Sequence, residues 1–166
     1  MRNIVLIGMP GSGKTTISKA LGKVLHLPVI DIDEWIVDYY GMTISDMFEI
    51  SEDYFRDHET EACRLLKEKQ NVIISCGGGV VLREENIAYL KENGTIYLLN
   101  RDLEKIMESV DTSTRPLLKE GKNKLLKLYE VRWPLYLKNA DVVIDNNGSI
   151  EQKIELLKKA FKLVWA

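Results

Sequence analysis

The sequence predicts an α/β fold in which a parallel β-sheet is buried between layers of helices. Two observations predict it. Short apolar stretches rich in β-branched residues recur along the chain, and longer segments with apolar residues at helical spacing separate them. The short stretches are apolar almost throughout, which is typical of strands covered on both faces. With 166 residues, 45 % of them hydrophobic, one domain spanning residues 1–166 is expected to bury a sizeable core.

The first predicted unit is a strand, a glycine-rich loop and a helix. Asn3–Ile7 is an apolar run that ends at Gly8, and Lys14–Leu25 repeats apolar residues on one helical face. A closing amphipathic helix is expected over Ile150–Trp165. Further strands are expected, in chain order, at residues 29–32, 72–75, 95–99 and 142–145.

Two connections differ from simple crossover helices. The segment at about residues 34–70 is too long for one helix and contains a capping signal at residues 51–53, so two or three helices are expected. An insertion of this kind commonly supplies a substrate pocket. The segment at about residues 110–124 is polar, contains Pro116 and Gly121, and shows little periodicity, which predicts a mobile loop.

Composition excludes several classes of protein. The chain has 23 Lys and Arg residues against 25 Asp and Glu residues, so it lacks the basic excess of a nucleic-acid-binding protein. No apolar run approaches the ~20 residues that span a bilayer, and no secretion signal is recognisable. Cys63 and Cys76 occur in no zinc-ligand spacing and are expected to be core thiols. A cytoplasmic monomer is expected.

The strongest motif runs from Gly8 to Thr15, where the sequence GMPGSGKT matches G-x-x-x-x-G-K-[ST]. In this motif glycines let backbone N–H groups approach the phosphates of a nucleotide, the lysine (Lys14) reaches the β and γ oxygens, and the hydroxyl coordinates Mg²⁺. The alternative is a glycine- and serine-rich turn that happens to precede a helix. The position between a strand and a helix favours nucleotide binding.

Two carboxylates follow the second predicted strand. Asp31 and Asp33 flank Ile32, so in an extended conformation both side chains would point the same way. There they could support Mg²⁺ through water and accept a proton from a substrate hydroxyl. The alternative is a pair of N-capping residues for a helix that begins near Glu34.

Three glycines and three arginines complete the candidate residues. The glycines, residues 77–79, follow the third predicted strand and either build a tight turn or let a ligand approach bare backbone. Arg56 lies in YFRDHE, Arg115 in RPLL and Arg132 in RWPLY. A single arginine is usually a solvated surface residue, but the neighbours of these three give reasons for each to be held in place.

In this order and spacing, the motifs GMPGSGKT, DID, FRDHE, SCGGGVV, RPLL and RWPLY resemble the shikimate kinase family over residues 4–145. Many NTPases share the phosphate loop, whereas the other motifs together are specific to this family. The resemblance implies a three-layer αβα fold of the P-loop kinase type with a five-stranded parallel sheet. It also implies a substrate-binding insertion at about residues 34–70 and a lid at about residues 110–124 that closes over ATP.

The implied reaction is transfer of the γ-phosphoryl group of ATP to the 3-hydroxyl of shikimate, with Mg²⁺ as cofactor. The resemblance implies that Asp33 orients or deprotonates the attacking hydroxyl and that Arg56 and Arg132 clamp the substrate carboxylate. Glu59 matches the acidic partner of the substrate arginine, and Arg115 the lid arginine that reaches the phosphates. The implied sets are Lys14, Asp33 and Arg115 for catalysis; Asp33, Arg56, Gly78, Gly79 and Arg132 for shikimate; Gly11, Ser12, Gly13, Lys14, Thr15, Thr16 and Arg115 for the nucleotide; and Thr15 directly, with Asp31 and Ser75 through water, for Mg²⁺.

Two departures from the family pattern concern the base of the nucleotide. Glu108 stands where many relatives carry an arginine near the adenine. Residues 145–150, with the sequence DNNGSI, supply no evident reader of the base. Contacts to the base are therefore expected to differ in this chain.

Two other functions are compatible with part of the pattern. Another small-molecule or nucleoside-monophosphate kinase would share the sheet and the phosphate loop, but Arg56 and Arg132 favour an acceptor with a carboxylate. A regulatory nucleotide-binding module without catalysis is disfavoured because Lys14, Asp33 and Arg115 are all present.

Overall fold

A computed structural model of the chain describes residues 2–109, 118–145 and 147–165. Its centre is a single five-stranded sheet in which every neighbouring pair of strands is parallel, in the order β2-β3-β1-β4-β5. The predicted fold class is thus confirmed. The strands are β1 (Asn3–Ile7), β2 (Val29–Asp31), β3 (Ile73–Ser75), β4 (Gly94–Asn100) and β5 (Val142–Asp145).

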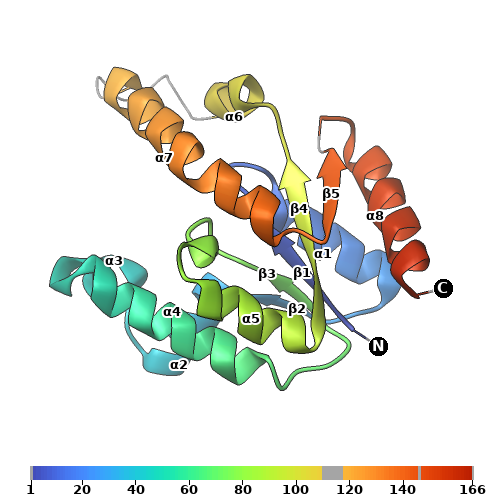
Figure 1. Cartoon of the computed structure of the whole chain (residues 1–166), viewed down its shortest axis with the longest axis horizontal. Coiled ribbons are helices and arrows are strands. Elements are labelled where there is room, and N and C mark those ends of the chain that lie inside the picture. The colour runs from blue at the N-terminus through green and yellow to red at the C-terminus, as the bar shows by residue number, and fades with distance from the viewer. Residues whose placement is uncertain (1, 110–117, 146, 166) are drawn as a thin grey trace.

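Helices cover both faces of the sheet (Figure 1). One face packs against α1 (Lys14–Leu25) and α8 (Ile150–Trp165). The opposite face packs against α4 (Glu52–Leu66), α5 (Glu84–Glu92) and α7 (Leu118–Asn139). The remaining helices are α2 (Ile32–Tyr40), α3 (Ile44–Ile50), α6 (Leu103–Ser109) and the 3₁₀ helix η1 (Val80–Leu82).

The central strand β1 explains why the predicted strands are apolar throughout. Side chains alternate between the two faces of a strand. Ile4 and Leu6 contribute to the core beneath α1 and α8, while Val5 and Ile7 contribute to the core on the other face. All four are fully or almost fully buried, so both faces of the strand are covered over residues 4–7.

The long connection between β2 and β3 contains three helices, α2, α3 and α4, as the sequence predicted. A side chain caps the start of each of them, and Asp31 does so for α2. Thr43 Oγ1 accepts a hydrogen bond from Asp46 N at the start of α3, and Ser51 Oγ accepts one from Tyr54 N at the start of α4. Such caps satisfy N–H groups that have no acceptor within the helix.

The extended conformation expected for Asp31 and Asp33 is wrong. Strand β2 ends at Asp31, and Ile32 already belongs to α2. Asp31 is the N-cap, and its Oδ1 accepts a hydrogen bond from Glu34 N at 3.2 Å. A carboxylate that caps a helix also interacts favourably with the helix dipole, so the polar end of the strand starts a helix instead of extending.

The irregular segment predicted at 110–124 falls in two parts. Residues 110–117, with Arg115 and Pro116, lie outside the described residues. Residues 118–124 are the first turns of α7, so the prediction of a loop is wrong there. Leu125 and Tyr136 are buried on the inner side of this helix. Its first turns have the polar composition of a loop, because the residues of a solvated helical turn are also polar.

Candidate active site

The phosphate loop turns the chain sharply from β1 into α1. Gly8, Gly11 and Gly13 have φ angles of 156°, 82° and 92°, a region in which a Cβ would be strained. A Cβ on Gly8 would also lie 2.9 Å from the carbonyl oxygen of Leu99. The predicted strand, glycine loop and helix therefore form as expected.

The N-terminus of α1 is open to an anion. The first hydrogen bond into the helix runs from Ile17 N to Gly13 O at 3.0 Å, so the N–H groups of Lys14, Thr15 and Thr16 have no intrahelical acceptor. No acidic residue lies in the first turn. Free N–H groups and an uncompensated helix dipole together form a phosphate site.

Lys14 adds a positive charge to this site. Its ammonium group folds over the loop and donates hydrogen bonds to Gly8 O at 2.6 Å and Met9 O at 2.9 Å. Burial lowers the pKa of Lys14 to about 8, while nearby acidic groups such as Asp33 oppose the shift. A bound phosphate would favour the protonated form.

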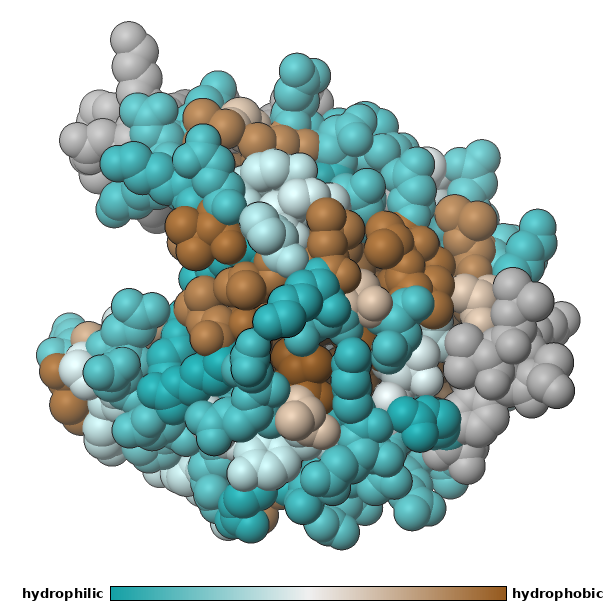
Figure 2. All heavy atoms as spheres, viewed as in Figure 1, coloured by the Kyte–Doolittle hydropathy of each residue, from teal (hydrophilic) through white to brown (hydrophobic). Residues whose placement is uncertain are grey.

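A cleft of about 450 Å³ joins the phosphate loop to the carboxyl ends of β2 and β3. In open α/β sheets ligands bind outside these strand ends. Beyond this cleft, the hollow between α7 and the helices α3 and α4 is visible in the space-filling view, with apolar side chains on its wall (Figure 2). The cleft is lined by Pro10, Gly11, Gly13, Lys14, Thr15, Thr16, Asp31, Asp33, Cys76, Gly77 and Gly78.

Each of the three consecutive glycines faces a charged side chain from a different helix. A Cβ on Gly77 would lie 3.0 Å from Asp33 Oδ1 of α2, and one on Gly78 would lie 3.1 Å from Arg132 Nη1 of α7. A Cβ on Gly79 would overlap the guanidinium group of Arg56 of α4. None of these glycines has a positive φ, so close approach, rather than an unusual turn, requires glycine here.

Arg56 is buried and held from several sides. Its Nη1 pairs with Glu59 Oε1 at 3.0 Å, and its guanidinium group lies 5.8 Å from the ring centroid of Phe48 and 5.1 Å from that of Phe55. Cation–π contacts of this kind strengthen when the group is desolvated. The site thereby keeps a positive charge in a fixed position.

Two carboxylates near the glycines have raised pKa values. Burial raises the pKa of Asp33, the neighbouring Asp31 adds to the shift, and Lys14 and Arg56 oppose it. Burial also raises the pKa of Glu59, against the effect of Arg56. A carboxylate in a cleft with a raised pKa is suited to accept a proton.

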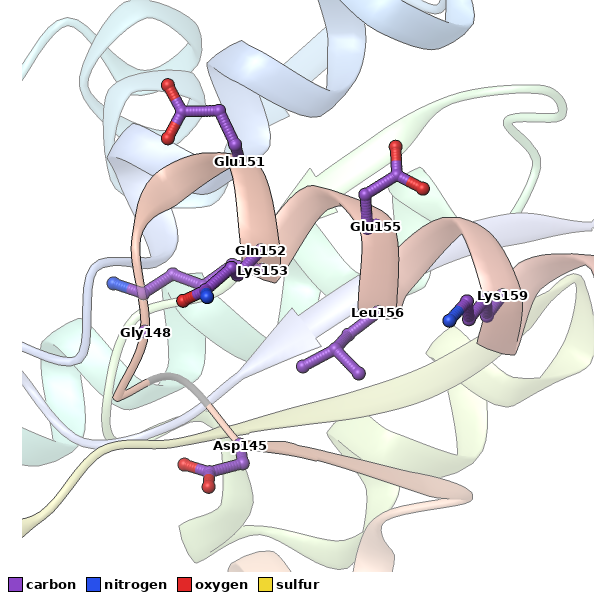
Figure 3. Close-up of a pocket in the computed structure, with 8 residues that line it drawn as sticks. All are labelled: Asp145, Gly148, Glu151, Gln152, Lys153, Glu155, Leu156 and Lys159. Atoms are coloured by element: carbon purple, nitrogen blue, oxygen red, sulfur yellow. The ribbon is translucent and has the colours of Figure 1, made fainter.

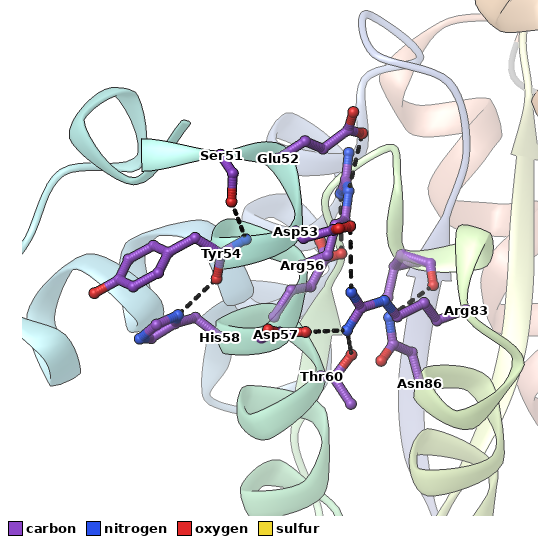
Figure 4. A network of polar contacts seen from close by, with 12 residues as sticks. Ser51, Glu52, Asp53, Tyr54, Arg56, Asp57, His58, Thr60, Arg83 and Asn86 are labelled. Atoms are coloured by element: carbon purple, nitrogen blue, oxygen red, sulfur yellow. Dashed lines mark hydrogen bonds and ion pairs between the residues drawn. The ribbon is translucent and has the colours of Figure 1, made fainter. Parts of the chain in front are cut away.

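Sequence reasoning gave no role to Arg83, which connects α4 to the segment that follows the glycines (Figure 4). Its Nη1 donates to Asp57 Oδ1 at 2.8 Å and to Thr60 Oγ1 at 3.3 Å. Nearby, the buried Asn86 donates from Nδ2 to Val80 O at 3.0 Å. Arg83 and its partners are 26 and 23 positions apart, so these contacts leave no local pattern from which they could be predicted.

The residues predicted for Mg²⁺ offer oxygen atoms, the ligands that this ion prefers. Asp31 and Ser75 are register partners on β2 and β3, and Thr15 is exposed in the first turn of α1. Among the described residues no group of three or more His, Cys, Asp or Glu side chains could hold a metal by itself. These donors therefore fit an ion that is bound largely by phosphate and water.

The other side of the phosphate loop faces β4 and β5. Arg101, just beyond β4, donates from Nη1 to Gly11 O at 2.8 Å. Asn147 Oδ1 accepts a hydrogen bond from Asp102 N at 3.0 Å, and Asn147 Nδ2 donates one to Asp102 Oδ1 at 3.1 Å. Asn147 thus connects the turn before α8 to the segment that follows β4.

A second pocket runs along α8 and the end of β5 (Figure 3). Asp145 and Gly148 lie at one end of it, and Leu156 forms part of its wall. None of the residues predicted for substrate, nucleotide or metal lines it.

In the part of the chain that the structure describes, no helix is long and apolar enough to cross a membrane. Cys63 and Cys76 are buried free thiols, as predicted.

The phosphate loop after β1, with a carboxylate and two arginines over the ends of β2 and β3, defines a P-loop phosphotransferase. The model of the shikimate kinase family matches residues 10–162. A shikimate kinase of Clostridium botulinum (strain Alaska E43 / Type E3) is 45 % identical, over 96 % of this chain and 97 % of its own length. A shikimate kinase of Clostridium beijerinckii is 46 % identical, over 96 % of this chain and 95 % of its own length.

Solved structures agree with this match. The shikimate kinase of Acinetobacter baumannii in complex with shikimate is 30 % identical, with a TM-score of 0.86 over 99 % of this chain and 93 % of that one. The shikimate kinase of Aquifex aeolicus is 34 % identical, with a TM-score of 0.84 over 96 % of both chains. The chain belongs to the shikimate kinase family and is an enzyme that phosphorylates shikimate with ATP. The findings do not favour the other kinases considered above.

Proposed function

We propose that the chain transfers the γ-phosphoryl group of ATP directly to the 3-hydroxyl of shikimate, with the acceptor seated on the three glycines. The observation that carries the proposal is the convergence of Asp33, Arg132 and Arg56 on Gly77, Gly78 and Gly79, beside the phosphate loop. These side chains come from three helices, and together they supply a base and two cations for one small acidic molecule.

The acceptor is held through its carboxylate and by backbone N–H groups. Arg56 and Arg132 clamp the carboxylate, because a guanidinium group pairs with it through two parallel hydrogen bonds. Gly78 and Gly79 offer N–H groups that have no acceptor within the described residues. Glu59 keeps Arg56 in place through their ion pair.

The nucleotide is held by the loop and the N-terminus of α1. Backbone N–H groups of Gly11 and of residues 13–16, with Gly13 among them, surround the phosphates, and Lys14 contacts the oxygens that gain charge. The N–H of Ser12 donates to Met9 O at 3.0 Å, so Ser12 contributes by shaping the loop. Arg115, outside the described residues, is proposed to contact the γ-phosphoryl group from the lid. An arginine in this role is worth ~10³-fold or more in rate.

Mg²⁺ would be held by the hydroxyl of Thr15 directly and by Asp31 and Ser75 through water. When bound, it would neutralise charge on the β and γ phosphates. The exposed hydroxyl of Thr15 and the paired positions of Asp31 and Ser75 support this assignment.

Asp33 orients the attacking hydroxyl and takes its proton. The hydroxyl oxygen forms a bond to the γ phosphorus while the bond from that phosphorus to the ADP oxygen breaks, so no covalent enzyme intermediate is needed. The raised pKa of Asp33 supports this role, since a base whose pKa is closer to neutrality holds the proton better.

The parts of the domain have separate tasks in this proposal. Helices α2 and α4, within the insertion at about residues 34–70, carry Asp33, Arg56 and Glu59, which supports a role in acceptor binding. The segment at about residues 110–124 is proposed as a lid over ATP, and the whole chain as a single, monomeric domain.

A coupled assay of ADP release tests the proposal. Shikimate should support turnover, whereas gluconate and nucleoside monophosphates at the same concentration should not exceed the rate with ATP alone. Removing Mg²⁺ with a chelator should abolish turnover, and adding it back should restore it. Turnover with gluconate or a nucleoside monophosphate equal to that with shikimate would contradict the proposal.

A further inference from the structure

Tyr136 is a buried residue of the active site to which the proposed mechanism gives no role. It is fully buried and lies four residues after Arg132, on the same face of α7. Its hydroxyl donates a hydrogen bond to Gly78 O at 2.5 Å, and Arg132, whose Nη1 would lie 3.1 Å from a Cβ on Gly78, is near enough to oppose the rise in the pKa of Tyr136. The hydroxyl thus binds one group proposed to hold the acceptor and lies beside a second.

We infer that Tyr136 is a positioning residue of the acceptor site, whose hydroxyl sets the direction of both the Gly78–Gly79 peptide and the Arg132 guanidinium group. The inference rests on the proposed function, because it requires that Arg132 and the glycine backbone bind the acceptor.

The hydrogen bond to Gly78 O also determines where the next N–H group points. The carbonyl of Gly78 and the N–H of Gly79 belong to one planar peptide, and no peptide bond in the described residues is cis. In a trans peptide these two groups point in opposite directions. Tyr136, by binding the carbonyl, directs the Gly79 N–H away from α7 and leaves it available for the acceptor.

Such an anchor matters because the peptide joins two glycines. Glycine has the greatest backbone freedom, and neither Gly78 nor Gly79 has a side chain that could pack and hold the peptide in place. A Cβ on Gly79 would overlap Arg56, and one on Gly78 would lie 2.9 Å from the ring of Pro10, so both positions favour glycine. The site therefore needs a group outside the glycine segment to fix it.

The same hydroxyl is suited to orient Arg132. A phenol has one proton and two lone pairs, so a hydroxyl that donates to Gly78 O can still accept from a guanidinium N–H. Arg132 has five N–H donors and keeps others for a carboxylate. Burial raises the pKa of Tyr136 to about 12, against the effect of Arg132, so the hydroxyl remains a donor throughout the neutral range.

Tyr97 provides a matched control. It is also a buried tyrosine, and burial raises its pKa to about 12, but its hydroxyl has no hydrogen-bond partner among the described residues. It belongs to the core beneath α1 and α8, on the other face of the sheet. Tyr136→Phe and Tyr97→Phe each remove one buried hydroxyl and keep the ring, so both variants should fold.

The experiment compares KM for shikimate, KM for ATP and kcat in the wild type, Tyr136→Phe, Tyr97→Phe and Arg132→Lys. Loss of a hydrogen bond to a charged group and of the peptide anchor should raise KM for shikimate about tenfold in Tyr136→Phe. KM for ATP should remain within twofold of the wild type. Tyr97→Phe should match the wild type in all three constants.

Two outcomes would overturn the inference. Tyr136→Phe could match Tyr97→Phe in KM for shikimate, or it could raise both KM values equally, as a general loss of packing would. Arg132→Lys separates this failure from failure of the proposed function. If Arg132→Lys raises KM for shikimate and Tyr136→Phe does not, only the role of Tyr136 is wrong; if neither does, the proposed acceptor site is wrong.

Discussion

At the scale of single residues, the active site depends on charged groups that the fold holds out of bulk water. Asp33 is the clearest case. The replacement Asp33→Asn keeps its size but removes its ability to accept a proton, so we expect kcat to fall at least ~100-fold, the usual contribution of general base catalysis. Binding of ADP, measured by calorimetry, should stay within about threefold, because Asp33 lies against Gly77, on the side of the cleft where the acceptor is proposed to bind.

Glu59→Gln is a useful comparison for Asp33→Asn. Glu59 is also buried with a raised pKa, but it pairs with Arg56 and is not placed to take the proton. We expect the Glu59→Gln substitution to raise KM for shikimate by a larger factor than it lowers kcat. Normal kcat in Asp33→Asn would exclude the proposed role of this carboxylate.

Lys14 predicts a pH dependence of nucleotide binding. In the free protein the ammonium group loses its proton as the pH rises through about 8, because burial lowers its pKa. Bound phosphate favours the charged form, so its pKa rises on binding and ADP binding takes up protons above this pH. The apparent Kd for ADP should therefore increase as the pH rises through 8, approaching tenfold per pH unit.

Calorimetry at pH 8.5 in two buffers of different ionisation enthalpy, without divalent cation, measures this proton uptake directly. The variant Lys14→Arg keeps its charge at this pH and serves as the control, since it should take up no proton. Equal, buffer-independent heats in the wild type would show that Lys14 does not titrate on binding.

The residues that sequence could identify are those whose chemistry is local. The glycines and lysine of the phosphate loop are close in sequence, and their spacing alone predicted the geometry observed. Asp31 and Asp33 were found as candidates, but the extended conformation expected for them was wrong, and the alternative of an N-cap is confirmed for Asp31. Phe55 is next to Arg56 in the sequence, whereas the contact of Phe48 with Arg56 could not be found, because folding alone brings α3 and α4 together.

At the scale of elements, the ends of the strands divide the site into two sides. The acceptor groups lie over β2 and β3, so the rest of the nucleotide is expected over β4 and β5, on the other side of the loop. Arg101 links the end of β4 to the loop through Gly11 O. We expect Arg101→Ala to raise Kd for ADP about fivefold, the effect of one hydrogen bond of ~1 kcal/mol, and to leave KM for shikimate unchanged.

Arg2→Ala is the matched control for Arg101→Ala. Arg2 donates to Lys91 O at 3.0 Å and to Gly94 O, at the amino end of β4, so it holds the same strand at the end away from the loop. Its loss should leave Kd for ADP unchanged. Titration of each variant with a fluorescent ADP analogue gives the comparison, and equal effects of the two substitutions would mean that Arg101 acts only through stability.

Elements were predictable where their periodicity was complete. Helix α8 was found because its apolar face repeats along the whole helix, and α1 because the loop marks its start. The first turns of α7 were not, because residues 119–124, with the sequence KEGKNK, contain no large apolar residue that could mark a helical face.

At the scale of the whole molecule, the two halves of the site draw on different elements around one sheet. The acceptor half joins α2, α4, α7 and the glycine segment, and the nucleotide half joins β1, α1 and the end of β4. The sequence predicted this layering because alternating strands and helices can bury their apolar faces in few ways. It could not predict which side chains from distant helices meet at the glycines.

Ligand-induced stabilisation should separate the two halves. A ligand at a hundred times its Kd stabilises the folded state by ~2.7 kcal/mol, which corresponds to about 5–10 °C in Tm for a domain of this size. In Arg132→Ala the shift with shikimate should be lost and the shift with ADP kept. In Lys14→Ala the shift with ADP should be lost and the shift with shikimate kept, because the two residues contact different ligands. Thermal unfolding followed by circular dichroism measures all four shifts, and a variant that loses both shifts would show that the substitution disrupts the domain rather than one half of the site.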